Sequence, residues 1–504
     1  MKTTFYKPTK HKRLIISTLC LFLSLNSIAQ WQGSGSEEDP YQIYTKADIL
    51  AMTEAINSSA PSYLEGIHFA LMNDIEEALT AEIGIGFKGY LHGRGYCINL
   101  ELHDETYFNN TLFGNFWGYM DSITFNGNVS NFYALIGHNQ YHGVLKYLTI
   151  NLNVQGAYIE TGNPGEYGFY CSIFTYNNDG IISHCINNSD INVLTPCKTV
   201  VIGVLTMGSM GEAHIIESCI NNGNITVNCQ PNTILWISIF QIYGNNMGSI
   251  INSINNGNIV INGIPEVFDL SCFAYAGSGT ISNCINTGSI QAKGTDIFGT
   301  FVCESFGTIS NCLNTGTIIG ENIASAFAAK VYAHNDPEFA KSEIKNCLNI
   351  GYVSGNNKVG ALFGEFINNE SNPNGTASVK NNISLSKTSG YVLFGDTNED
   401  IFLNPSLILE NNFYDKQMVP QQSTAIGDIP GKAEGLLTTD MTGFALQEIL
   451  GDGWSYAEGR YPIPLGLEND SVVIAAVTPI FLHAENENNY EHVDSVSKNF
   501  YVTT

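Results

Sequence analysis

The chain has 504 residues and a formal net charge of −26, with 47 acidic against 21 basic side chains. An acidic protein of this kind is a poor partner for nucleic acid, whose phosphates attract lysine and arginine. Hydrophobic residues make up 44% of the chain and charged residues only 13%, so the apolar material suffices for one long core.

Residues 1–29 have the pattern of a secretory signal peptide. Basic residues up to Arg13 precede an apolar segment at Leu14–Leu25, and Ser27-Ile28-Ala29 forms a small-residue cleavage site before Gln30. The apolar segment is too short to span a bilayer comfortably, and no later stretch is suited to a transmembrane helix. We therefore expect an exported protein, either secreted or displayed at the cell surface.

Residues 30–109 are expected to form an N-terminal cap and the first coils of a repeating structure. Thr45 can cap an amphipathic helix over Lys46–Asn57. A helix here would cover the open end of a stacked fold, where the first coil exposes unpaired strand edges. Further on, the Gly84–Gly89 segment matches a dinucleotide-binding loop, but a strand follows it in place of a helix, so no cofactor is expected.

Residues 110–410 repeat one motif about every 30 residues. Its clearest copy is Ile216-Glu217-Ser218-Cys219-Ile220-Asn221-Asn222-Gly223, and each copy follows a Phe-containing element. A fixed period in this range marks a stacked architecture. The β-branched runs are too short for helices, and Asn and Gly supply left-handed or tight corners between them. Each repeat is thus expected to contain two or three short strands.

These repeats predict an all-β fold, a right-handed parallel β-helix (solenoid) of about nine or ten coils. Each coil returns to the same azimuth, so equivalent residues lie one strand spacing, about 4.8 Å, apart. Stacked aromatic rings, thiols and amides should then form columns along the interior. The expected columns are Phe174, Phe240, Phe273, Phe327 and Phe363; Cys185, Cys219, Ser253, Cys284, Cys312, Cys347 and Asn382; and Asn187, Asn221, Asn255, Asn286, Asn314 and Asn349.

The chain contains 12 cysteines, one of them in the signal segment. Disulfides are the usual state of cysteines in an exported protein. Repeat-phased cysteines on adjacent parallel strands point the same way, however, and this geometry favours buried free thiols. Cys197 and Cys229 lie outside the column and remain disulfide candidates. No Cys-x-x-Cys pair occurs, so no zinc site is expected.

Residues 411–468 depart from the repeat and are expected to form a small C-terminal cap with a helix near Thr439–Leu450. Residues 469–504 contain strand-like runs at Val472–Ile474, Ile480–Leu482 and Phe500–Val502. This last part is interpreted as a tail or as the start of a further β module.

Several segments resemble known bacterial proteins. Gly360-Ala361-Leu362-Phe363-Gly364, with a variable loop and strands such as Ile344–Gly351, resembles the GLUG motif of surface proteins. Phe87–Gly95, Asp39-Pro40-Tyr41 and Gly459-Arg460-Tyr461-Pro462 resemble parts of large exported proteins of Bacteroides-type bacteria. The resemblance implies a repetitive surface protein with an accessory or adhesive role.

The resemblance covers roughly residues 31–468. Some GLUG-bearing proteins are immunoglobulin-cleaving metallopeptidases, but this chain has no His-Glu-x-x-His motif. Neither that activity nor its metal is therefore implied for this chain.

Sugar-cleaving enzymes also occur among solenoids, and a hydrolase needs two or three converging carboxylates. The aspartates of the repeat region fall in different phases, mostly in predicted loops, and no two acids share a column on neighbouring coils. The histidines are interpreted as loop or corner residues, and no arginine lies between Arg94 and Arg460 to assist an anionic-sugar lyase. We predict no catalytic residue. The side chains considered are Asp121, Asp179, Asp190, Asp269, Asp296, Asp336, His138, His142, His184, His214 and His334.

Four aromatic residues are candidates for ligand binding. Tyr176 and Tyr275 occupy equivalent places two residues after the Phe column, Tyr243 is close to that register, and Trp236 precedes it. An exposed aromatic row would stack on a glycan or a partner surface. The competing interpretation, which we favour, is that Phe174 and Tyr176 share one strand face and both lie in the core.

The sequence predicts a secreted or cell-surface β-helix protein with an adhesive or structural binding role toward a glycan or a partner surface, without catalysis. The alternative is a carbohydrate-active β-helix enzyme, a polysaccharide lyase or glycoside hydrolase, whose acids converge from loops. A third interpretation is a fragment of a longer adhesin.

Overall fold

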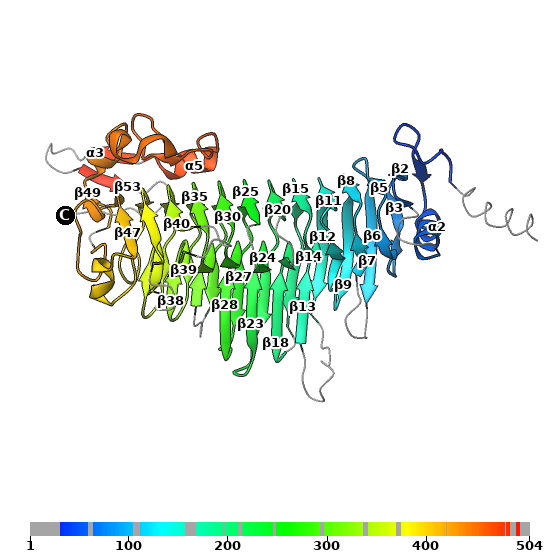
Figure 1. Ribbon diagram of the computed structural model, residues 1–504, viewed down its shortest axis with the longest axis horizontal. Helices are drawn as coiled ribbons and strands as arrows, with labels where there is room; N and C mark the ends of the chain where they lie inside the picture. The colour runs from blue at the N-terminus through cyan, green and yellow to red at the C-terminus, as the bar shows by residue number, and fades with distance from the viewer. Residues whose placement is uncertain are drawn as a thin grey trace, which may run out of the picture.

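The computed structural model describes most of the chain and shows a rod-shaped parallel β-solenoid (Figure 1). This architecture confirms the predicted fold class. No described helix is long and apolar enough to cross a membrane. The signal segment lies outside the described residues. These are 31–58, 64–103, 111–156, 168–194, 197–209, 214–244, 248–292, 297–335, 341–368, 374–419, 421–478, 480–483 and 490–493.

Four parallel sheets form the sides of the rod. Sheet A has 13 strands, from β1 (Tyr41–Ile43) to β47 (Leu407–Glu410), and sheet C has 10, from β4 (Gly84–Phe87) to β44 (Phe363–Asn368). Sheet B extends from β3 (Ile75–Leu79) to β49 (Ala433–Leu436). Sheet D has seven strands and occupies only the middle of the rod. Its strands are β13 (Gly168–Ser172), β18 (Thr199–Gly203), β23 (Ile234–Ser238), β28 (Val267–Ser271), β33 (Ile297–Gly299), β38 (Ile323–Ser325) and β43 (Val359–Gly360).

One coil in the middle of the rod shows the path of the chain. After β18 in sheet D come β19 (Thr206–Ser209) in sheet C and β20 (Ile215–Glu217) in sheet A. The coil closes through β21 (Ile220–Asn221) and β22 (Ile225–Asn228) in sheet B. The prediction of two or three strands per repeat therefore missed the strand in sheet D. It also missed the division of the sheet B segment into two strands.

The corner between sheets A and B is a single left-handed residue that precedes the cysteine column. Asn252, Asn283 and Asn311 have φ angles of 52°, 54° and 53°. Asparagine tolerates this conformation better than most residues. The Asn-Gly pairs serve another purpose, because a Cβ on Gly257 would lie 2.0 Å from the carbonyl oxygen of Gly223 in the preceding coil. These glycines allow close approach of adjacent coils and are not left-handed corners.

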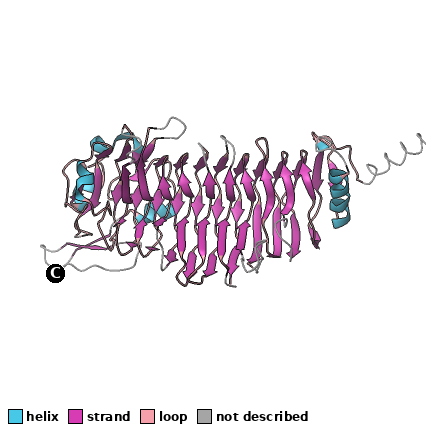
Figure 2. Ribbon diagram, turned by 60° about the horizontal axis from the view of Figure 1, so that its bottom comes forward, coloured by secondary structure: helices cyan, strands magenta, loops and turns pink. Residues whose placement is uncertain are grey.

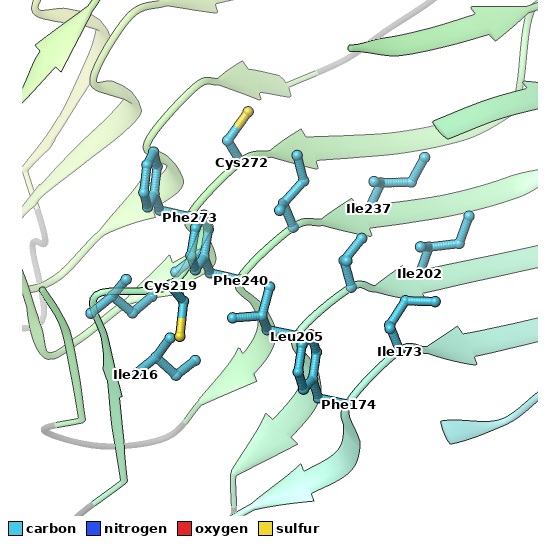
Figure 3. Close-up of a cluster of buried hydrophobic side chains, with 14 of the residues drawn as sticks. Ile173, Phe174, Ile202, Leu205, Ile216, Cys219, Ile237, Phe240, Cys272 and Phe273 are labelled. Atoms are coloured by element: carbon cyan, nitrogen blue, oxygen red, sulfur yellow. The ribbon is translucent and has the colours of Figure 1, made fainter. Parts of the chain in front are cut away.

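The interior contains the predicted columns. The Asn187 amide donates to Asn221, and the same bond of 2.7–2.8 Å repeats through every coil to Asn349. Phe240 and Phe273 stack with ring centroids 4.7 Å apart, and Figure 3 shows Phe174 and Leu205 continuing this column. All of these side chains are buried. The column prediction is therefore confirmed, and Phe301 and Phe394 extend it.

The described cysteines are all free thiols, and the repeat-column members are buried. Cys197 and Cys229 are not bonded to each other. Burial raises the pKa of Cys197 to about 11 and, together with the neighbouring Cys197, the pKa of Cys229 to about 12. These thiols stay protonated near neutral pH, and a thiol reacts mainly as its thiolate.

We therefore expect the native protein to resist alkylation. Iodoacetamide in neutral buffer should leave the repeat-column cysteines unmodified, whereas denaturant should expose every cysteine to reaction. Intact mass spectrometry before and after reduction provides the check. A mass that rises by two hydrogens on reduction would show a disulfide and contradict the free-thiol column.

Helix α2 (Lys46–Asn57) has the predicted bounds and lies at the N-terminal end of the rod (Figure 1). The Thr45 hydroxyl accepts from the Asp48 N–H, and the Asp48 carboxylate accepts from the Thr45 N–H, which completes a capping box. Met52 and Ile56 are buried on its inner side. That α2 protects the first coil as a cap stays a prediction.

The C-terminal part differs from its prediction in two ways. Parallel pairing continues past residue 410 through β48 (Asn412–Asp415) to β49. The expected helix near Thr439–Leu450 is two short helices, α3 (Thr438–Met441) and α4 (Gln447–Leu450), because Gly443 between them adopts a φ of 68°. Figure 2 shows helices near the two ends of an otherwise stranded rod.

The strand predicted at Val472–Ile474 is also wrong, since this segment forms helix α5 (Ser471–Ala476). The Asp470 carboxylate accepts from the Val473 N–H at 3.1 Å, which favours a helical start. The run at Ile480–Leu482 is a strand, β52 (Ile480–His483), antiparallel to β53 (Tyr490–Val493). The run at Phe500–Val502 lies outside the described residues.

The segment from about residue 437 to 478 lies along the side of the rod (Figure 1). It packs against an outward-facing apolar column of sheet B that includes Ile285, Leu313, Leu348 and Ile383. The buried side chains that this segment places in the contact include Trp454 and Val473. The segment therefore covers a sheet face and does not simply close the last coil.

Candidate functional site

The outer face of sheet D carries a row of aligned side chains that includes Trp236, one of the predicted binding residues. Tyr170 in β13 pairs with Val201 in β18, which pairs with Trp236 in β23 and then Asp269 in β28. In β13, β18 and β23 the residues that flank this row point inward and are buried, as Leu235 and Ile237 are on either side of Trp236. Strand alternation therefore directs this row out of the rod.

Sheet C contributes a second outward row. Tyr176 in β14 (Thr175–Asn178), Met207 in β19, Ile242 in β24 (Gln241–Gly244) and Tyr275 in β29 (Ala274–Gly277) occupy successive coils in register. The core interpretation of Tyr176 and Tyr275 is wrong. The chain bends from sheet D into sheet C at this point, and both Phe174 and Thr175 are fully buried, so the two-residue period does not continue across the bend.

The two rows meet because the outer faces of sheets C and D turn toward each other. Val201, Met207 and Ile242 point out of the rod, yet each is at most 3% exposed, because they pack against one another. Four half-buried aromatic side chains surround them. We call this cluster the aromatic corner. Its members are Val201, Met207 and Ile242 with Tyr170, Tyr176, Trp236 and Tyr275.

The structure thus brings together three of the four predicted binding residues, namely Tyr176, Trp236 and Tyr275. Tyr176 also stacks on Tyr133 with ring centroids 4.1 Å apart, which extends the aromatic surface by one coil. Tyr243 pairs with Gly208, one position beyond the outward row, and its side chain lies outside the described part of the structure.

Asp269 lies at the edge of the aromatic corner and is 8% exposed. Its Oδ2 accepts a hydrogen bond from the Trp236 indole N–H at 3.3 Å, and the Tyr275 hydroxyl bonds the same carboxyl. Burial raises the pKa of Asp269, although the bond from Trp236 opposes this effect; the charge of Glu304 raises the pKa further. The Asp269 carboxyl is therefore positioned between two aromatic side chains of the corner.

A charged column of sheet C continues from this edge. Glu304 in β34 (Val302–Ser305) pairs with Lys330 in β39 (Ala328–Ala333), which pairs with Glu365 in β44. The Tyr332 hydroxyl donates to Glu304 Oε1 at 3.0 Å. The two glutamates thus share a column, with a lysine on the coil between them.

Neighbouring side chains bond the glutamates at both ends of this charged column. Lys358 contacts Glu365 at 2.6 Å and Asp396 at 3.5 Å. Burial raises the pKa of Tyr332, and the neighbouring Glu304 charge adds to the shift, so this hydroxyl remains a hydrogen-bond donor near neutral pH. A polar surface therefore adjoins the aromatic corner at Asp269 and Glu304.

The other predicted acids and histidines do not join this site. Asp121 and Asp190 lie on strands, as Asp269 does, so the loop prediction is wrong for three of the aspartates.

His138 is also a strand residue, in β10 (Ala134–Asn139), and its Nε2 lies 2.7 Å from Asp179. Corners and turns hold His142 and His184, as predicted. His214 and His334 are buried beside strand ends, whereas Asp296 and Asp336 lie outside the described residues.

Sequence analysis did not single out Glu304, Lys330 or Tyr332. The available signal was a single charged residue between Cys303 and Ser305, which are both buried, so that strand alternation places Glu304 on the outward face. Among the described residues, no group of three or more metal-ligating side chains is arranged to hold an ion. A separate cavity of about 20 Å³ beside His214 and Gln241 has room for little more than one water molecule.

Comparisons of the chain with protein-family models, with curated proteins and with solved structures found no match.

Proposed function

We propose that this chain is an exported β-solenoid that binds glycan chains through the aromatic corner, in an adhesive or structural role without catalysis. The observation that carries the proposal is the cluster of Tyr170, Tyr176, Trp236 and Tyr275 on one outward surface. A sugar ring has an apolar C–H face that packs on an aromatic ring, and hydroxyls that need hydrogen-bond partners.

The shape of the site supports a chain-like ligand. The corner spans four successive coils, about 4.8 Å apart along the rod; Tyr170 and Tyr176 come from the first coil, Trp236 from the third and Tyr275 from the fourth. Carboxylates and hydroxyls then continue the surface from Asp269 to Glu365. A ligand lying along the rod axis would thus meet apolar faces first and hydrogen-bonding groups next.

The sequence features of the N-terminal segment and the resemblance to GLUG-motif surface proteins support export and an adhesive role. The low proportion of charged residues and the columns of asparagine favour a rigid scaffold that displays one surface. Export and surface display remain part of the proposal.

Trp236→Ala should weaken glycan binding by about tenfold or more, because truncation of a central tryptophan typically removes about 2 kcal/mol or more of binding energy. A glycan array followed by titration of the best ligand measures the effect. Tyr352→Ala is the matched control, since this tyrosine is 41% exposed and lies away from the corner.

Two outcomes would contradict this proposal. One is equal glycan binding by wild type and Trp236→Ala protein. The other is an absence of binding to any glycan combined with Trp236-dependent binding of a protein partner, which would identify a protein surface as the ligand.

A second candidate function is cleavage of a carbohydrate chain, and the nearness of Asp269 and Glu304 favours it. Burial raises the pKa of Asp269, in the direction that a general acid requires, while Glu304 can supply a second carboxylate. Incubation of the bound glycan with the protein discriminates between the two functions. New reducing ends or unsaturated products that disappear in Asp269→Asn would support the enzyme, whereas an intact glycan supports binding alone.

A further inference from the structure

The edge of the aromatic corner indicates which class of glycan fits, provided that the corner binds glycans as proposed. Three acidic side chains, Asp269, Glu304 and Glu365, face this surface from sheets D and C. Lys330 lies between the two glutamates in their column. Lys358 is engaged by Glu365 and Asp396. Among the groups left to meet a ligand, the two acids Asp269 and Glu304 therefore outnumber the single cation Lys330.

An anionic glycan would be poorly accommodated here. Carboxylate- or sulfate-bearing sugars are usually bound by arginine, whose planar guanidinium matches these groups. No arginine occurs between Arg94 and Arg460, so sheets C and D contribute none. An ionised sugar placed on Trp236 would meet Asp269, whose carboxyl accepts a hydrogen bond from that same indole. Like charges at such an interface are strongly unfavourable.

An uncharged sugar satisfies the same groups. An ionised carboxylate only accepts hydrogen bonds, and a sugar hydroxyl can donate to it. Glu304 accepts one bond from Tyr332 and retains further acceptor capacity. The Tyr275 hydroxyl bonds the Asp269 carboxyl, and the Tyr332 hydroxyl donates to Glu304. These bonds hold both acids in a fixed orientation.

We propose that the aromatic corner selects uncharged glycan chains, and that Asp269 and Glu304 determine this preference by accepting hydrogen bonds from sugar hydroxyls and repelling anionic sugars. Trp236 and the tyrosines supply the stacking surface, which charged and uncharged chains share. The two acids supply the discrimination between them.

The test uses the full exported chain and a defined set of probes. Oligosaccharides from neutral glucan, mannan and galactan are compared with oligogalacturonates by titration at low and high salt. Wild-type protein should bind at least one neutral probe and bind the uronates about tenfold or more weakly. Salt should reduce that difference, because it screens the repulsion.

The double variant Asp269→Asn/Glu304→Gln keeps side-chain shape and removes both charges. It should lose affinity for the neutral probe and gain at least about tenfold in relative affinity for the uronates. The matched control is Glu101→Gln/Glu410→Gln, which changes the net charge equally at two exposed positions on sheets B and A. The control should leave the preference unchanged, and circular dichroism verifies that each variant is folded.

The outcomes separate this inference from the proposed function. Uronate binding equal to neutral binding in wild type, or an unchanged preference in the double variant, would overturn the charge selection even if Trp236→Ala abolishes binding. Neutral-glycan binding that is insensitive to Trp236→Ala would instead overturn the proposed function. A change of preference in the charge control would assign the effect to net charge and contradict a role for Asp269 and Glu304.

Discussion

Replacement of Asn255 by leucine should destabilise the protein by about 4 kcal/mol or more. The Asn255 amide is fully buried and donates to Asn286 at 2.8 Å, while its oxygen accepts from Asn221 at 2.8 Å. It also exchanges two bonds with the backbone of Gly257. Leucine would leave these partners unsatisfied, and each buried polar group without a partner costs about 1–3 kcal/mol.

The adjacent residue offers a matched control. Asn256 belongs to an exposed amide ladder, in which it donates to Asn222 at 2.9 Å. Asn256→Leu should change the free energy of unfolding by less than about 1 kcal/mol, because water can replace the lost bonds. Urea denaturation followed by circular dichroism measures both variants. Equal stability losses at positions 255 and 256 would argue against a buried amide ladder that stabilises the coils.

Phe273→Ala is the second change with a large expected effect, about 3–5 kcal/mol. The Phe273 ring is fully buried and stacks on Phe240 at 4.7 Å and on Phe301 at 4.5 Å, with interplanar angles of 5° and 7°. Truncation would open a cavity in the middle of the aromatic column. Both stacking contacts would be lost with it.

The control for this variant is Phe444→Ala, at a phenylalanine that is 51% exposed. It should shift the free energy of unfolding by no more than about 0.5 kcal/mol. The same urea denaturation serves for both proteins. A Phe273→Ala protein as stable as Phe444→Ala would show that the column rings do not stack as described.

The interior could be predicted from the sequence because the repeat itself fixes it. Residues such as Asn221 and Asn255 recur at one position of the motif, and a parallel coil converts that recurrence into contact. The periodicity does not fix how many sides a coil has. Sheet D was missed because its strands, such as β18, vary in sequence from coil to coil.

The candidate site was predicted only in part, and the corner between sheets explains why. Alternation within one strand places Trp236 outward, but it does not carry from Phe174 to Tyr176 across the bend. Asp269 and Glu304 come from different sheets, and their nearness depends on the angle between those sheets. The angle between the two sheets cannot be predicted from the sequence pattern.

The C-terminal segment shows a similar limit. Its residues follow no repeat, so the helix and strand predictions there used local propensity alone. Val473 in α5 is β-branched, yet burial against the side of the rod and the Asp470 cap favour a helix. Tertiary contacts overrode propensity at this position.

Hydrogen–deuterium exchange with and without a bound glycan tests the central claim most directly, because it locates the ligand on the intact rod. The account predicts that a neutral oligosaccharide protects backbone amides in β23, β24, β28 and β29, around Trp236 and Tyr275, and leaves sheet A unchanged. Protection confined to sheet A or sheet B, with the aromatic corner unaffected, would contradict it.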